Sequence, residues 1–282
     1  MKIKVIIFKI YRIINSIYDN YNINFDGNLF CFFFNLKAKL RNKKVIFKTN
    51  KIKSSYIAKS KKYKRLFKAK KQNLISYSNG IESRALSLAK DYMLDKIEFL
   101  ENDVIVDCGA NIGDLEIFFK ERGHNINYIG IEPSPSEFSC LKENLILKKS
   151  KCFNFALFDK NGSVKFYISS EFGDSSIFNP INYTQEIIVQ SKRFDSLNKE
   201  LKIAKIKLLK LEAEGAEPEI LLGFGNYLQN VEYISADLGF ERGLKQESTL
   251  PRVSNFLIGE GFEMIALNYP RLTALFKNKK KK

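Results

Sequence analysis

The sequence of 282 residues predicts an α/β protein with a doubly wound, mostly parallel sheet that follows a basic N-terminal extension. Two observations support this fold class. From about Ile81, short β-branched runs alternate with stretches whose apolar residues recur every three or four positions, which is typical of a parallel sheet with helices on both faces. Charge also changes along the chain, because residues 1–73 contain 20 Lys and Arg against two acids, whereas residues 74–276 contain 22 against 29.

The elements of the main region follow from these periodicities. The first is a helix from about Ile81 to Leu100. The expected strands are 104–106, 128–131, 152–158, 164–168, 187–189, 206–211, 231–236, 262–267 and 272–276. The expected helices among them are 115–120, 137–147, 218–224 and 251–258. The last two strands are close enough in the chain to form a hairpin that completes the sheet.

The basic N-terminal region, residues 1–73, contains two apolar patterns. Isoleucines recur at helical spacing over residues 1–18, at Ile3, Ile6, Ile7, Ile10, Ile14 and Ile17. This pattern predicts an amphipathic basic helix that either lies in a membrane interface or docks on the protein's own core. Lys9 and Arg12 interrupt the apolar segment, so we do not expect a signal peptide. Residues 29–34 form an apolar run of strand length, where we expect a short strand.

The net charge of +16 arises in that N-terminal region and in a Lys-rich tail, residues 277–282. Lysines and aromatic residues are interleaved between Lys37 and Lys71, a pattern that suits single-stranded nucleic acid or the head groups of an anionic membrane. A biased composition with a solvated basic face would explain the same counts. We therefore treat residues 1–73 as an accessory region that can contact an anionic membrane peripherally, with nucleic acid as the weaker alternative.

Composition excludes several classes of site. The chain has four cysteines without paired spacing and a single histidine, so neither a disulfide framework nor a zinc cluster is expected. No uncharged apolar run reaches the roughly 18 residues that a membrane-spanning helix needs. We expect a protein of the reducing cytoplasm, with peripheral contact at the inner face of the membrane as an additional possibility.

The turn after the first strand of the main region carries the strongest functional signal. That strand delivers Asp107 into D-C-G-A-N-I-G, where Gly109 and Gly113 permit a tight turn and a close approach to a ligand. The next strand ends at Glu132, where an acid can accept hydrogen bonds from ribose hydroxyls. The G-x-x-x-G spacing lacks the middle glycine of the dinucleotide motif, so the pattern favours S-adenosylmethionine, a nucleoside with a cationic tail, over NAD.

The cofactor-binding residues expected from this turn and the next strand end are Asp107, Gly109, Ala110, Asn111, Gly113 and Glu132. Each has a plainer explanation taken singly. Asp107 could cap a helix, Asn111 could be a satisfied loop amide, and Glu132 could merely end a strand. The two acids nevertheless follow successive strands in matching positions, which is difficult to obtain by accident.

Three segments resemble the FkbM family of S-adenosylmethionine-dependent methyltransferases, namely V-I-V-D-C-G-A-N-I-G-D, Y-I-G-I-E-P-S-P and K-L-E-A-E-G-A-E-P-E-I-L. The resemblance covers about Ile81 to Leu275 and implies a class I methyltransferase domain with a seven-stranded sheet in residues 74–276. It also implies O-methyl transfer, commonly to sugars of surface polysaccharides, glycolipids or secondary metabolites. A weaker echo, F-A-L-F-D, adds Ala156 to the implied cofactor-binding residues. Glu212 stands where the family pattern K-x-D-x-E-G has Asp.

The third segment supplies the candidate catalytic residues. Period-two spacing places Lys210, Glu212 and Glu214 on one side if the strand continues that far. Glu212 or Glu214 is expected to act as base or substrate clamp, because a sugar hydroxyl is a weak nucleophile that must lose its proton. Lys210 would orient the acceptor or pair with a carboxylate. A salt-bridged turn without a catalytic task is the alternative, and the spacing alone does not establish a metal site.

The leading hypothesis is an S-adenosylmethionine-dependent O-methyltransferase that acts on a carbohydrate-containing acceptor. An RNA-directed methyltransferase that uses the basic region for phosphates is the second hypothesis. A non-catalytic protein anchored to an anionic surface is the third, and a nicotinamide oxidoreductase is the fourth. Asp195, Asp237 and Glu241 also follow predicted strands and could approach the acceptor, although capping roles would fit them equally.

Overall fold

The computed structural model describes residues 27–50, 54–68, 76–169, 174–269 and 271–280. These residues fall into two compact units, which divide between Arg84 and Ala85. The Ile-rich stripe of residues 1–18 lies outside the described residues, so its predicted helix stays a prediction. Among the described residues, no helix is long and apolar enough to cross a membrane.

The first unit consists of one helix on a small antiparallel sheet. It contains α2 (Gly27–Leu40), β1 (Ile46–Asn50), β2 (Ser55–Lys59) and β3 (Lys64–Phe67), with the strands in the order β1-β2-β3. The Asn35 side chain fixes the helix to β1, because it donates to the Phe47 carbonyl oxygen at 2.9 Å and accepts from the Phe47 N–H.

The strand predicted at residues 29–34 is wrong, because this run lies inside α2. A continuous apolar run has no periodicity that separates a strand from a buried helical segment. The residues that follow this run favour a helix. Phe30, Phe34 and Ala38 are buried at helical spacing, and Lys37 and Lys39 in the last turn interact favourably with the helix dipole.

The second unit is built on a seven-stranded sheet, in the order β14-β15-β11-β10-β4-β5-β6. Its strands are β4 (Val104–Cys108), β5 (Asn127–Ile131), β6 (Lys151–Phe153), β10 (Ile206–Leu211), β11 (Val231–Asp237), β14 (Phe262–Asn268) and β15 (Thr273–Asn278). Strand β15 is antiparallel to both of its neighbours, and the other pairs are parallel. The doubly wound, mostly parallel sheet predicted from the sequence is therefore confirmed, including the closing hairpin.

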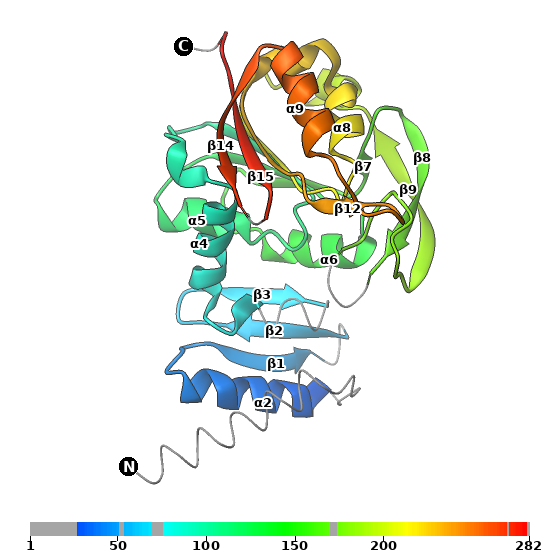
Figure 1. Ribbon diagram of the computed structural model, residues 1–282. Coiled ribbons are helices and arrows are strands. Elements are labelled where there is room, and N and C mark those ends of the chain that lie inside the picture. Colours follow the sequence, from blue (N-terminus) through cyan, green and yellow to red (C-terminus); the bar gives the residue numbers. More distant parts are fainter. Residues whose placement is uncertain (1–26, 51–53, 69–75, 170–173, 270, 281–282) are drawn as a thin grey trace. The chain divides into compact units, whose positions relative to one another are not determined.

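Helices cover both faces of this sheet (Figure 1), with α5 and α6 on one face and α8 and α9 on the other. The helices are α4 (Ile81–Asp91), α5 (Leu115–Glu121), α6 (Pro135–Asn144), α7 (Phe194–Leu201), α8 (Glu217–Phe224) and α9 (Leu250–Gly259), with short 3-10 turns η1 (Leu94–Lys96) and η2 (Gly225–Asn230). Helix α4 ends nine residues before the predicted boundary at Leu100, because Met93 adopts a left-handed conformation with φ 56°.

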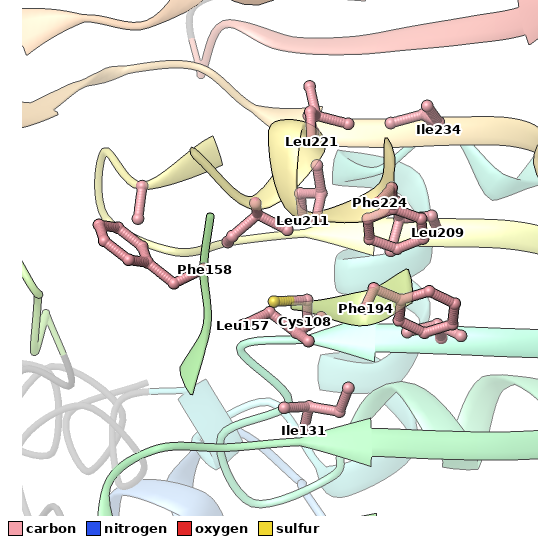
Figure 2. Close-up of a cluster of buried hydrophobic side chains, with 14 of the residues drawn as sticks. Cys108, Ile131, Leu157, Phe158, Phe194, Leu209, Leu211, Leu221, Phe224 and Ile234 are labelled. Atoms are coloured by element: carbon pink, nitrogen blue, oxygen red, sulfur yellow. The ribbon is translucent and has the colours of Figure 1, made fainter. Parts of the chain in front are cut away.

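The core on one side of the sheet joins α7 and α8 to β4 and β10. Phe194 and Phe224 stack with their ring centroids 4.2 Å apart, and Cys108, Leu209 and Leu211 pack in the same cluster (Figure 2). The alternation of the strands fills this cluster, since side chains two positions apart point to the same face. Helix α7, which has no counterpart in the sequence prediction, supplies Phe194.

The predicted third strand, residues 152–158, is divided between two sheets. Only Lys151–Phe153 pairs with β5 as β6, whereas Ala156–Leu157 forms β7 in a separate sheet with β8 (Gly162–Ile168) and β9 (Gln185–Lys192). The Asn154 side chain donates to the carbonyl oxygens of Glu132 and Pro133, and the chain leaves the large sheet there. The prediction of one continuous strand is therefore wrong.

The sheet brings the predicted motifs to one edge. Because β4, β5, β10 and β11 are parallel, their carboxyl ends meet at the same side of the unit. A small hairpin, β12 (Phe240–Arg242) with β13 (Glu247–Ser248), follows β11 there. We refer to this side as the carboxyl edge.

Candidate active site

Asp107 lies at the carboxyl edge near the end of β4, where its side chain is buried. Its Oδ2 atom accepts a hydrogen bond of 2.6 Å from the Tyr128 hydroxyl. Its Oδ1 atom lies 2.9 Å from Nζ of Lys210 on the neighbouring strand β10. The carboxylate is thus held from both sides, and both partners belong to strands that flank β4.

Lys210 connects three groups at this edge. Its Nζ atom donates to the Gly109 carbonyl oxygen at 2.8 Å and lies 2.9 Å from both Asp107 Oδ1 and Glu212 Oε2. These three contacts match the three N–H donors of an ammonium group. Burial lowers the pKa of Lys210, but Asp107 and Glu212 outweigh it and hold that pKa above its ordinary value. Of the two roles expected for Lys210, pairing with a carboxylate is the one that its contacts favour.

The turn between β4 and α5 depends on left-handed residues. Gly109, Asn111 and Gly113 have φ values of 73°, 50° and 84°. The N–H groups of Gly109 and Ala110 donate to the Ile131 carbonyl oxygen at 2.9 and 3.1 Å, which ties the turn to the end of β5. A Cβ atom on Gly109 would lie 1.8 Å from the carbonyl oxygen of Glu212. Position 109 therefore requires a glycine, because the main chain at Glu212, directly after β10, leaves no room for a side chain there.

Glu132 follows β5 and holds the other side of the same turn. Its carboxylate accepts the Asn111 N–H at one oxygen and the Ser134 N–H at the other, both at 2.8 Å. A carboxylate oxygen has two lone pairs, so each oxygen retains a further acceptor position. Burial raises the pKa of Glu132 to about 8, although the two N–H donors oppose that shift.

Ala156 follows closely after Asn154, whose side chain donates to the Glu132 carbonyl oxygen at 2.8 Å. It lies in β7, pairs with Ser191 of β9, and is buried in the hydrophobic cluster that also contains Phe155 and Leu157. Its assignment came from a short echo of a family motif, which carries no information about which sheet the segment joins.

Arg271 and Tyr92 complete the charged network, and the sequence prediction missed both. Arg271 lies just before β15, donates to Glu212, and contacts Asp237 Oδ2 at 2.6 Å. Its guanidinium group also lies 5.5 Å from the centre of the Tyr92 ring. Burial and the nearby Glu212 raise the pKa of Tyr92. The predicted hairpin contained a signal for Arg271, which lies in the turn between β14 and β15. Strand β14 runs parallel to β11, so the turn after β14 lies at the carboxyl edge.

Glu214 lies in a tight turn after β10 and has a left-handed φ of 49°. The buried carboxylate of Glu217 holds this turn by accepting the Ala213 N–H at 2.9 Å and the Gly215 N–H at 3.3 Å. The Ser176 hydroxyl donates to the Glu214 carbonyl oxygen at 2.8 Å. Burial, followed by the charge of Glu241, raises the pKa of Glu214.

Acidic groups outnumber basic ones in this network. Its acids are Asp107, Glu132, Asp174, Glu212, Glu214, Glu217, Asp237 and Glu241. Lys210 and Arg271 pair with three of them. Asp195, by contrast, pairs with Arg193 beside α7 and does not join the network through any contact the structure gives. No group of three or more His, Cys, Asp or Glu among the described residues is arranged to hold a metal ion.

Two methyltransferases are similar to this chain in sequence. The 2-O-methyltransferase NoeI of Sinorhizobium fredii is 24% identical over 217 residues, which cover 71% of this chain and 88% of that protein. The hexuronic acid methyltransferase AglP of Haloferax volcanii is 24% identical over 140 residues, which cover 49% of this chain and 56% of that protein.

Solved structures give weaker likenesses. A SAM-dependent methyltransferase from Aquifex aeolicus is 11% identical, with a TM-score of 0.40 over 70% of this chain and 96% of that one. A TehB-like SAM-dependent methyltransferase from Corynebacterium glutamicum is 13% identical, with a TM-score of 0.39 over 73% of this chain and 93% of that one.

The profile of the methyltransferase FkbM domain matches residues 107–263, which is more than half of the chain. The match begins at Asp107 and includes Glu132 and the turn around Glu214. It excludes Tyr92 and Arg271, which complete the network from outside the matched segment. The chain therefore belongs to the FkbM methyltransferase family.

Proposed function

We propose that this methyltransferase uses S-adenosylmethionine to methylate a hydroxyl group of a carbohydrate-containing acceptor. The observation that carries the proposal is the position of two acids, Asp107 and Glu132, at the carboxyl ends of the adjacent strands β4 and β5. They lie on either side of the 109–113 turn. The names of two relatives, a 2-O-methyltransferase and a hexuronic acid methyltransferase, support a sugar hydroxyl as acceptor.

The donor set at the carboxyl edge fits this cofactor. Glu132 keeps acceptor positions that can receive the ribose hydroxyls while its N–H contacts to Asn111 and Ser134 hold it in place. Carboxyl groups outnumber cations here and burial raises the pKa of several of them, so a ligand with positive charge, such as a sulfonium group, would favour their ionised form. Asp107 and Lys210 order the turn on which the nucleoside would lie. We assign cofactor binding to Asp107, Gly109, Ala110, Asn111, Gly113 and Glu132, and Ala156 stays a candidate from the family resemblance.

The base for the acceptor hydroxyl is best assigned to Glu214. Glu212 is paired with both Lys210 and Arg271, and two cations stabilise its ionised form. Glu214 lies near Glu241 instead, and burial together with the charge of Glu241 raises the pKa of Glu214, so its carboxylate accepts a proton more readily than an ordinary one. When bound, S-adenosylmethionine supplies a methyl group on a positively charged sulfur. The chain must then hold the acceptor oxygen in line with that group and remove its proton.

We further propose that residues 74–276 form the catalytic domain and that residues 1–73 are accessory to it. Lys210, Glu212 and Glu214 stay candidate catalytic residues, with Lys210 and Glu212 in positioning roles. The contacts of Lys210 with Asp107 and Gly109, and of Glu212 with Arg271, support these positioning roles. Each contact joins two different segments of the carboxyl edge.

Incubation with S-adenosylmethionine labelled on its methyl group, together with fractionated cell extract, tests the acceptor class. We expect label in polysaccharide or glycolipid and its release with the sugar after hydrolysis. Label confined to RNA or to protein would overturn the carbohydrate assignment. An enzyme that binds no S-adenosylmethionine in calorimetry would overturn the cofactor assignment.

Glu214→Gln tests the base. We expect kcat to fall about 10²-fold or more, because a positioned base commonly contributes that factor, while donor affinity stays near the wild-type value. Glu186→Gln is the matched control, since Glu186 is a part-exposed acid on β9 that pairs with Lys165. Equal loss of turnover and donor affinity in Glu214→Gln would remove it from the catalytic role.

A further inference from the structure

Helix α2 has two apolar faces, and one of them points away from its own unit. Phe30, Cys31, Phe34 and Ala38 form the buried face. On the opposite side Leu29, Phe32 and Leu40 are 42%, 60% and 36% exposed, and Leu36 is half-buried. These four positions recur every three or four residues and define what we call the outer stripe. Exposed apolar side chains that are gathered on one helix face are typical of an interaction surface.

Positive charges predominate in the unit that carries the outer stripe. Its described residues, 27–50, 54–68 and 76–84, contain thirteen Lys and Arg and one acid, Glu82. Lys39 on α2 is exposed, as are Lys43 and Lys44 directly after the helix. An apolar helix face with cationic groups at its rim is typical of helices that lie in the interface of an anionic membrane.

We propose that the outer stripe of α2 docks on the surface of a membrane containing anionic lipids. The apolar side chains would enter the boundary between head groups and acyl chains, and the lysines would contact the head groups. Helix α2 fits this position because its buried face is already fixed to β1 through Asn35, so the outer stripe needs no rearrangement of the unit.

Two other occupants fit less well. A second copy of this face would bring lysines of the same sign together, which opposes a symmetric contact. Single-stranded nucleic acid would meet the lysines, but bases stack on aromatic rings, and three of the four outer-stripe residues are leucines. A lipid surface satisfies the apolar and the charged parts of the face together.

Vesicle binding by the full chain tests the proposal, with phosphatidylcholine vesicles compared with vesicles that also contain phosphatidylglycerol. We expect binding to the anionic vesicles that weakens with added salt. Phe32→Glu should reduce it at least about tenfold, because a charge replaces a ring that would be buried. Leu29→Asn is a milder second variant. Ile188→Glu is the matched control, because Ile188 on β9 is 65% exposed and lies in the other unit.

Each alternative gives a distinct result that contradicts lipid docking. Wild-type chain that ignores anionic vesicles, or Phe32→Glu that binds them as wild type does, would overturn the proposal. A dimer in sedimentation that dissociates in Phe32→Glu, without vesicle binding, would assign the stripe to a second copy. Lowered thermal stability of both stripe variants with unchanged vesicle binding would show that residues 1–26 cover the stripe. Binding of single-stranded RNA without vesicle binding would assign the face to nucleic acid.

Discussion

Five charged side chains alternate in sign across the carboxyl edge, in the order Asp107, Lys210, Glu212, Arg271 and Asp237. They come from β4, β10, β11 and the segment before β15, so the chain of contacts joins four strands of the sheet. Each charge has an opposite neighbour, and the Asp107–Lys210 pair is buried, whereas the Glu212 and Arg271 side chains are 23% and 34% exposed. Removing one partner of such a buried pair commonly costs about 3–5 kcal/mol.

Glu212 and Arg271 should act as a coupled pair. Glu212→Asp shortens the side chain that reaches both Lys210 and Arg271, and Arg271→Met removes the cation. We expect the double variant to be less destabilised than the sum of the single ones by about 0.5–3 kcal/mol in equilibrium urea unfolding. The exposed pair Lys165–Glu186 is the control, with a coupling expected near about 0–1 kcal/mol. Additive effects at Glu212 and Arg271 would show that the contact does not contribute.

Glu132 should make donor affinity depend on pH. Its pKa of about 8 exceeds its ordinary 4.5, so between these values the folded chain keeps a proton that the unfolded chain has lost. Stability from Glu132 therefore falls as pH rises through that range. Ribose hydroxyls donate more strongly to a carboxylate than to a neutral acid, so S-adenosylmethionine affinity should rise as pH passes 8.

Calorimetric titration on both sides of pH 8 checks this dependence, with Glu132→Gln as the control. The control is needed because burial also raises the pKa of Glu217 to about 7 and that of Glu241 to about 8. Glu132→Gln should bind the donor more weakly and lose the rise with pH. The same pH slope in wild type and variant would mean that another group titrates.

Several site residues could be placed from the sequence, because a residue that ends a parallel strand must lie at the carboxyl edge. Asp107 and Glu132 follow short β-branched runs, and Lys210 lies in the predicted strand 206–211. Tyr92 and Arg271 could not be placed in this way. Their contacts depend on how α4 and the closing hairpin pack on the sheet, and no local periodicity reports that packing.

At the scale of elements, the 109–113 turn has little freedom to change. Gly109→Ala would combine a left-handed φ with a Cβ atom 1.8 Å from the Glu212 carbonyl oxygen. Gly123 is the matched control, because its φ of 72° is nearly the same and nothing lies within 4 Å of its added Cβ. We expect Gly123→Ala to cost about 1–2 kcal/mol. Gly109→Ala should cost about 1–3 kcal/mol more and weaken S-adenosylmethionine binding.

Thermal unfolding and calorimetry distinguish the two glycine variants. Gly123→Ala should bind S-adenosylmethionine as wild type does, since its added methyl group meets open space. Equal stabilities for the two variants would contradict the claim that the main chain after β10 requires a glycine at position 109.

Elements with strong periodicity were predicted well, and those decided by distant contacts were not. The predicted strand 206–211 is β10 as the structure has it, and the helix at 218–224 differs from α8 by one residue. The strands predicted at residues 29–34 and 152–158 were wrong because their structure depends on distant contacts. Each is a short apolar run, and its state depends on whether β1 or the edge of the large sheet lies beside it.

At the scale of the whole chain, the charge is divided unevenly between two units. Lys and Arg exceed acids in the first unit, which also has the outer stripe, whereas the second unit has the acidic carboxyl edge. The charge counts along the sequence predicted this division. They did not predict the outer stripe, because the exposed side of α2 can be identified only when the helix and its buried side are known.

The place of β15 has a consequence for the way the protein is made. Strand β15 lies between β14 and β11 and pairs with both. Although β14 is translated before β15, it can join the sheet only after β15 has paired with β11. A nascent chain that has not yet released Thr273–Asn278 from the ribosome would leave one side of β11 unpaired and open to other strands. Arg271 emerges just ahead of this segment, so the sheet and its charged network are completed in the same step.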